Sequence, residues 1–257
     1  MSRFSNLEFN DESASQSRRP LSTPDANHYL GEAQAAFAQA DFEAALRCYA
    51  KAIEFSPRLA TAWTGQVRAL IELGELSEAS LWADKALEQF PSEPELLAAK
   101  AVALARNGDV DGAMAFSDSS IAERGETPYV WLARGDVLLA RKERRAEFCF
   151  EKALVLASKD WFVAWLAARI RAFYRQFSLA LKLVHQALEL KPDHAVLWLF
   201  AGNCQRELGL VGAAQTSFQQ AIELNPRCQE AKLGIAGLSQ TGLGARLGGW
   251  WRRHFGK

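Results

Sequence analysis

The sequence predicts an all-α protein built from a tandem array of helical pairs, and three observations predict it. Alanine and leucine are frequent throughout the 257 residues while β-branched residues are scarce, a composition that favours helix over strand. Small and aromatic residues recur about every 34 positions, the sign of a repeat architecture. Glycine and proline recur between the predicted helices, where they end helices and form turns. At 49% hydrophobic, the chain has enough apolar material for a large core.

Four columns of residues define six repeat units. The first alanine column is spaced by 34, 34, 33, 34 and 34 residues and consists of Ala45, Ala79, Ala113, Ala146, Ala180 and Ala214. The second column consists of Ala52, Ala86, Ser120, Ala153, Ala187 and Ala221. The proline column holds Pro57, Pro91, Pro192 and Pro226. The aromatic column holds Tyr29, Trp63, Trp131, Trp165 and Trp198, with Leu97 in the remaining place.

Each column has a physical reason within a unit of two helices. Alanine lets two crossing helices approach closely, and an aromatic ring fills the space between the paired helices. Gly74, Gly108 and Gly209 supply the turn inside three units, and the prolines close the units. We therefore assign the column tryptophans to the structure. Units four and five are one residue shorter between the aromatic and alanine columns and lack the turn glycine.

These columns resemble the tetratricopeptide repeat, most fully in the sixth unit, where Trp198, Gly202, Gly209, Ala214, Phe218, Ala221 and Pro226 occupy the positions of that motif. The resemblance covers residues 26–227 as six repeats, and residues 228–240 look like a capping helix. It implies a right-handed α-solenoid of stacked helix-turn-helix repeats whose first helices line a concave groove. We expect a disordered N-terminal arm at 1–25, the superhelical domain at 26–240, and a flexible tail at 241–257.

Composition narrows the possible classes of protein. The formal net charge is zero, but residues 26–128 carry eight basic and sixteen acidic side chains, whereas residues 129–192 are basic. The four cysteines lie far apart, without the spacing of a zinc site or a disulfide framework. Neither a secretory signal nor an apolar run of eighteen residues is present, so we expect a reduced, soluble, cytoplasmic protein.

The sequence contains no catalytic constellation. It has no glycine-rich phosphate loop, no His-Glu-x-x-His zinc motif and no Gly-x-Ser-x-Gly elbow, and its four histidines stand alone. We therefore predict no enzyme activity and no catalytic, cofactor-binding or metal-binding residue. The prediction is a scaffold or adaptor that binds a partner protein or peptide segment in its concave groove.

Reading the groove columns along the repeats gives an apolar stripe in repeats four and five. The candidate partner-binding residues are Tyr129, Leu132, Asp136, Leu139, Leu166, Ile170, Phe173, Tyr174, Leu199, Asn203 and Arg206. An exposed apolar stripe of this kind suits an amphipathic peptide. The alternative is that these side chains fill contacts between neighbouring repeats. The lysines and asparagines with which some members of the family bind acidic C-terminal peptides are mostly absent here.

A second candidate surface is basic and includes Arg134, Arg141, Lys142, Arg144, Arg145, Arg169, Arg171 and Arg175. With the tail residues Trp250, Trp251, Arg252, Arg253 and Phe255, it suggests an alternative function at a membrane surface or on nucleic acid. The absence of a nucleic-acid-binding fold disfavours nucleic acid. For the tail, docking on a partner, folding back over the stripe and capping the last helix also stay open. The acidic and basic halves suggest salt-sensitive self-association.

Overall fold

The computed structural model describes residues 25–238, and every regular element in that range is an α-helix. The first helices of the six pairs are α1 (Ala26–Ala38), α3 (Ala60–Leu73), α5 (Pro94–Arg106), α7 (Pro128–Ala140), α9 (Trp161–Phe173) and α11 (Ala195–Glu207). The second helices are α2 (Phe42–Phe55), α4 (Leu76–Leu87), α6 (Val110–Ala122), α8 (Ala146–Leu156), α10 (Phe177–Leu190) and α12 (Val211–Leu224). A further helical stretch covers residues 229–238, at the predicted capping position.

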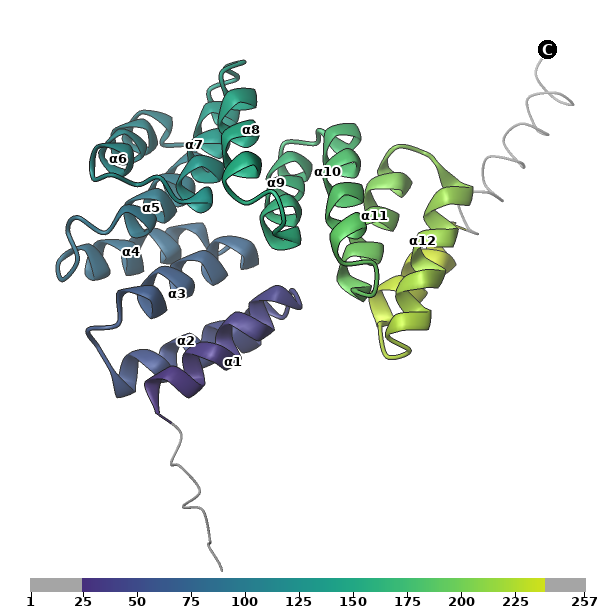
Figure 1. The fold of residues 1–257 in the computed structure, drawn as a ribbon, viewed down its shortest axis with the longest axis horizontal. Coiled ribbons are helices and arrows are strands. Elements are labelled where there is room, and N and C mark those ends of the chain that lie inside the picture. The colour runs from purple at the N-terminus through teal and green to yellow at the C-terminus, as the bar shows by residue number, and fades with distance from the viewer. Residues whose placement is uncertain (1–24, 239–257) are drawn as a thin grey trace, which may run out of the picture.

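The pairs follow one another along a curved array (Figure 1). Within each pair the two helices pack together, and most second helices also contact the first helix of the next pair. The structure thus confirms the prediction of stacked helical pairs. The domain limits at residues 25 and 240 stay predictions, and the tail residues Trp250, Trp251, Arg252, Arg253 and Phe255 lie outside the described residues.

The two small-residue columns lie in the core. All six alanines of the first column are at most 1% exposed, and the residues of the second column, including Ser120, are likewise buried. The Ser120 hydroxyl donates a hydrogen bond of 2.8 Å to the carbonyl of Pro94, so its polar atom is satisfied inside the core. Small side chains at these points allow the helix backbones to approach closely, as the sequence predicts.

The turn inside each pair uses a left-handed residue even where glycine is missing. Gly74, Gly108 and Gly209 have φ between 74° and 98°. The first, fourth and fifth pairs place Ala40, Lys142 and Arg175 in the same conformation, with φ between 57° and 59°. A non-glycine residue pays roughly 1 kcal/mol or more for this conformation. The packing of the paired helices therefore imposes the turn on these three residues.

The tryptophans of the second and sixth pairs are anchored by the proline column. The indole N–H of Trp63 donates to the Pro57 carbonyl at 2.8 Å, and that of Trp198 donates to the Pro192 carbonyl at 2.7 Å. The third and fourth units end without this proline, and the buried indole N–H groups of Trp131 and Trp165, in the units that follow them, have no partner among the described residues. The tryptophans of the second and sixth repeats thus bond to a proline carbonyl, whereas those of the shortened fourth and fifth repeats do not.

Trp165 does not occupy the place that the sequence predicts for it. The prediction put each column ring between the two helices of its own pair, but the fully buried Trp165 ring stacks against Phe42 of α2, with ring centroids 6.5 Å apart. The reason is the missing residue between Trp165 and Ala180, since one residue turns a side chain about 100° around a helix. The ring therefore faces the inner side of the array.

We predict that Gly65→Ala destabilises the protein by roughly 1–3 kcal/mol. A Cβ at this position of α3 would overlap the ring of Tyr49, a buried side chain of α2. The free energy of unfolding from urea denaturation measures the effect. Gly31→Ala is the matched control, because nothing lies within 4 Å of a Cβ there, and it should stabilise α1 by about 0.5–1 kcal/mol. Equal effects of the two substitutions would contradict this packing.

Candidate functional site

The inner side of the array is formed by the first helices of the pairs. Contacts link α1 to α3, α3 to α5, α5 to α7 and α7 to α9, so these helices lie side by side. Residues on their shared face come from different repeats, and a partner on this face touches several repeats at once. The openings on this face are therefore the candidate binding surfaces.

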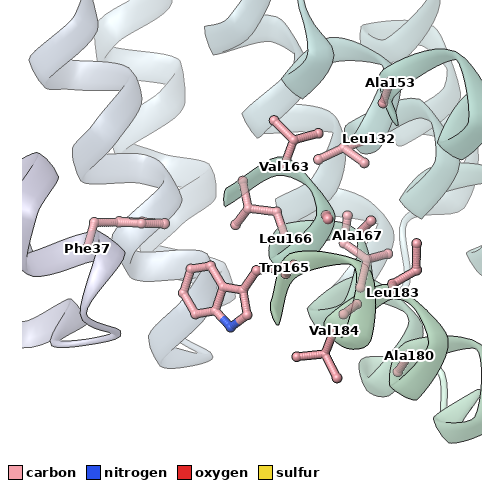
Figure 2. Close-up of a cluster of buried hydrophobic side chains, with 14 of the residues drawn as sticks. Phe37, Leu132, Ala153, Val163, Trp165, Leu166, Ala167, Ala180, Leu183 and Val184 are labelled. Atoms are coloured by element: carbon pink, nitrogen blue, oxygen red, sulfur yellow. The ribbon is translucent and has the colours of Figure 1, made fainter. Parts of the chain in front are cut away.

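Helix α9 reaches across this inner side to the first two repeats. Phe162 lies 6.0 Å from Phe37 of α1 between ring centroids, and Figure 2 shows Phe37 extending from α1 toward Trp165. Arg169 of α9 donates from Nε to the Glu72 carboxylate of α3 at 2.7 Å, a contact between residues 97 positions apart. These contacts close part of the inner side, because repeat five packs against repeats one and two.

A buried network of charged and polar groups continues from this contact. Asp136 of α7 is fully buried and accepts hydrogen bonds from Arg106 Nε at 3.0 Å, Arg106 Nη2 at 2.7 Å and the Tyr174 hydroxyl at 2.7 Å. Arg106 also lies 3.9 Å from Glu72, the partner of Arg169. The network ties together α3, α5, α7 and the end of α9.

The network shifts the pKa values of Glu72 and Tyr174 from their ordinary values. Burial alone would raise the pKa of Glu72, but the nearby Arg169 and Arg106 outweigh it, and the pKa lies below its ordinary value. Burial and the Asp136 carboxylate raise the pKa of Tyr174, so its hydroxyl remains a donor. Because these groups are already paired with one another, the network acts as a structural link between repeats.

The structure places most of the predicted binding residues inside the array. Five are buried: Leu132, Asp136, Leu139, Leu166 and Ile170. Four are partly buried: Tyr129, Tyr174, Leu199 and Asn203. Phe173, 49% exposed, and Arg206 are exposed. Most of the apolar stripe is thus buried, which favours the alternative that its side chains fill contacts between neighbouring repeats.

The basic residues of repeats four and five do not form one free surface. Arg134 pairs with Asp118 at 2.7 Å, and Arg141 pairs with Glu143 at 2.7 Å. A further ion pair of 2.6 Å links the buried Arg171 to Glu147, and Arg169 is bound to Glu72. Arg175 lies 3.5 Å from Glu207. Lys142 and Arg144 are exposed, and most of the other basic charge is neutralised within the protein.

A cavity of about 370 Å³ opens on the inner side between the first three repeats and the start of α9. Its wall includes four aromatic rings, those of Phe37, Tyr49, Trp161 and Phe162. Its polar wall includes Gln34, Thr61, Thr64, Arg68, Glu93 and Glu95. Concave sites that combine apolar walls with a few polar groups are typical of ligand binding.

Local contacts position the aromatic residues in the wall of this cavity. The Asp160 carboxylate caps α9 by accepting a hydrogen bond of 2.9 Å from the Phe162 backbone N–H. Trp161 packs on His194, at the start of α11, with ring centroids 4.5 Å apart. On the opposite wall, Gly65 lets the Tyr49 ring lie against α3. Repeats one, two, five and six therefore all contribute to the shape of the cavity.

The polar groups of the cavity are only partly satisfied. Thr64 is 4% exposed, and its hydroxyl oxygen has no hydrogen-bond partner among residues 25–238. The Arg68 guanidinium lies 3.8 Å from the centroid of the Tyr129 ring and 5.4 Å from that of Phe37. A buried hydroxyl without a partner costs stability, and a ligand that reaches it recovers part of that cost.

Sequence reasoning found only part of this cavity. Gln34, Phe37, Thr64 and Arg68 fall in the groove columns, but the prediction placed the binding site on the stripe of repeats four and five. Trp161 and Phe162 stood outside every column. A signal was present, because two large aromatic residues directly after a capping aspartate are unusual at the start of a repeat helix. Their meeting with α1 depends on the curvature of the array.

Residues 25–238 contain neither a metal cluster nor a membrane span. No group of three or more histidine, cysteine, aspartate and glutamate side chains there is arranged to hold a metal ion. None of the helices in the same range is long and apolar enough to cross a membrane.

Comparison with known proteins identifies the repeats. Two family models described as tetratricopeptide repeat match residues 30–94 and 195–228. The chain is 22% identical over 186 residues to the BBSome complex member BBS4 of Bos taurus, covering 72% of this chain and 36% of that protein. It therefore spans only about a third of the length of this relative.

Two solved structures share the fold. The Cut9–Hcn1 hetero-tetramer of the APC/C aligns with a TM-score of 0.52 and 17% identity, covering 86% of this chain and 44% of that one. TTC0263, a thermophilic TPR protein of Thermus thermophilus, aligns with a TM-score of 0.51 and 15% identity, covering 84% and 99%. These two structures show the shared fold, and the matched repeat models together with the six helical pairs of residues 25–238 identify the chain as a tetratricopeptide-repeat protein.

Proposed function

We propose that this protein is a non-enzymatic scaffold that binds a segment of a partner protein in the cavity lined by Phe37, Tyr49, Trp161 and Phe162. Tetratricopeptide-repeat proteins typically mediate protein–protein interactions and are generally not enzymes. The observation that carries the proposal is the cavity itself, which lies on the inner face and has aromatic walls and one unsatisfied polar group, the Thr64 hydroxyl. Aromatic side chains in concave sites are frequent anchors of protein recognition.

The burial of the apolar stripe limits the surfaces to which a partner can bind. Because Leu132, Leu166 and Ile170 are covered by neighbouring repeats, a partner cannot reach them without opening the array. The cavity has a volume of about 370 Å³ and offers rings from α1, α2 and α9. A short segment with one or two inserted side chains suits this volume better than a long helix lying along the groove.

The proposal includes a role within a larger assembly. The BBS4 relative is named as a member of the BBSome complex, and a rigid array with one defined cavity is suited to joining subunits. All four cysteines are free thiols, which fits the cytoplasmic location that the sequence predicts. The ion pairs of Arg134, Arg141 and Arg171 give no support to the alternative at a membrane or on nucleic acid.

We predict that Thr61→Trp weakens peptide binding at least about tenfold, a loss of roughly 1.4 kcal/mol. Thr61 is exposed on α3 and lines the cavity, so an indole there fills its mouth without entering the core. Peptides selected from a random displayed library on the full chain provide the ligands, and calorimetry measures their affinities.

Ser77→Trp is the matched control, because Ser77 is exposed on α4 and does not line the cavity. Circular dichroism checks that both variants remain helical. Peptides that bind the wild type and the Thr61→Trp variant with equal affinity would locate the binding surface elsewhere and refute this function for the cavity.

A further inference from the structure

The cavity has a chemical preference set by its charges. Glu93 and Glu95 stand at the start of α5 and are partly exposed on its wall. Within residues 25–238 neither carboxylate has an ion-pair partner within 4 Å. The first three repeats around them are acidic, since residues 26–128 carry a net charge of −8. The field on this side of the array therefore attracts cations.

Arg68, the cation on the cavity wall, is already engaged. Its guanidinium stacks on Tyr129 and lies near Phe37, and it is one of three arginines around the partly buried Glu72. Its charge thus acts on Glu72, which does not line this cavity. The two carboxylates of α5 remain available to a ligand.

Besides the two carboxylates, the cavity offers aromatic rings and the Thr64 hydroxyl to a ligand. A cation over the face of a Trp, Tyr or Phe ring is attracted by the ring quadrupole, most strongly where water is excluded. The buried Thr64 hydroxyl, which has no partner in residues 25–238, can accept a hydrogen bond from an N–H group. Carboxylate, ring face and hydroxyl acceptor are the groups that suit a flat guanidinium with several N–H donors.

We propose that the cavity receives an arginine side chain of the partner segment, with its guanidinium between the aromatic wall and the carboxylates of Glu93 and Glu95. This inference rests on the proposed function, because it names the chemistry of the segment that the cavity binds. Arginine is preferred to lysine, since a guanidinium stacks on rings and makes paired hydrogen bonds to a carboxylate, whereas an ammonium is a compact, strongly hydrated charge.

The test compares three fluorescein-labelled peptides that differ at one position, with the sequences GSFRFSG, GSFQFSG and GSFEFSG. We expect the arginine peptide to bind the full chain at least tenfold more tightly than the other two in fluorescence anisotropy at low salt. Replacing Glu93→Gln and Glu95→Gln together should reduce this preference to less than about threefold, because the carboxylates provide the attraction that salt also screens.

Glu88→Gln with Glu123→Gln is the matched control, because both glutamates are exposed and neither lines the cavity. This control should keep the full preference. The measurements are repeated in a variant with Trp250→Ala, Trp251→Ala, Arg252→Gln and Arg253→Gln, since that segment also combines arginine with aromatic side chains. A gain in affinity for the arginine peptide in this variant would support the proposal.

Three outcomes overturn the inference. If the glutamine or glutamate peptide binds as tightly as the arginine peptide and Thr61→Trp abolishes binding of each, the arginine preference is wrong while the proposed function stands. If the doubly substituted Glu93 and Glu95 variant keeps the full preference, these carboxylates are not the recognition groups. If none of the three peptides binds at about 1 mM, the arginine inference fails, and the library selection decides the proposed function separately.

Discussion

Asp136→Ala should destabilise the protein by about 3–5 kcal/mol, the range found when one partner of a buried ion pair is removed. Asp136 is fully buried and accepts two hydrogen bonds from Arg106 and one from Tyr174. Without the carboxylate, the Arg106 guanidinium stays buried and keeps only Glu72, 3.9 Å away, as an opposite charge. Urea denaturation followed by circular dichroism measures the loss.

Asp118→Ala is the control for this prediction. Asp118 also binds an arginine, Arg134 at 2.7 Å, but its side chain is 59% exposed. Exposed ion pairs contribute about 0–1 kcal/mol, so this substitution should have a small effect. Replacing the buried pair by apolar residues, Asp136→Leu with Arg106→Met, should recover much of the lost stability, because no unpaired charge remains. A loss of less than about 1 kcal/mol for Asp136→Ala would mean that water reaches the network.

Leu166→Asp should unfold or severely destabilise the protein, by more than about 4 kcal/mol. Leu166 is 6% exposed and belongs to the core that joins α7, α9 and α10. The substitution removes a buried apolar side chain, which alone costs about 2–5 kcal/mol in a Leu→Ala change, and adds a carboxylate without a partner. Thermal melting and helical ellipticity report the outcome.

Phe173→Asp, a change in the same predicted stripe, should be tolerated to within about 1 kcal/mol. Phe173 is 49% exposed at the end of α9 and loses mainly its contact with the Arg106 guanidinium, 4.4 Å from the ring centroid. If Leu166→Asp left the fold intact while binding of a partner was lost, the stripe would be an open site after all. The two substitutions therefore test which residues of the predicted stripe lie in the core and which lie on the surface.

Helix α9 closes part of the inner side by packing against the first pair. A tetratricopeptide array that is open along its whole length can hold a long segment, whereas here Phe162 and Trp165 of α9 face Phe37 and Phe42 of the first pair. These contacts stand beside the cavity that opens between the first three repeats and the start of α9. Because the contact between Arg169 and Glu72 joins α9 to α3, we expect that loosening it would change the size of this cavity.

The repeat columns predicted the fold because their causes are local. Ala45 and Ala79 must be small wherever two helices of a pair cross, and Gly74 must allow a left-handed turn between two helices a few residues apart. Such constraints recur in each unit and appear in the sequence as a period. They set helix limits, pairing and the order of the array without information from distant residues.

The candidate site could not be predicted in the same way. Glu72 and Arg169 meet across 97 residues, and Trp161 reaches the cavity only because the array curves enough to bring α9 opposite α1. The curvature adds up from small rotations between successive pairs, and no single column encodes it.

The sequence by itself determined that helical pairs stack in six units and that each needs small residues, rings and turns at fixed positions. The tertiary structure alone decided that Leu166 is core, that Trp165 faces inward, and that Glu93 and Glu95 share a cavity with Phe162. The physical reason is distance along the chain: contacts within a pair depend on residues that are neighbours in sequence, whereas the inner surface depends on the summed geometry of every repeat.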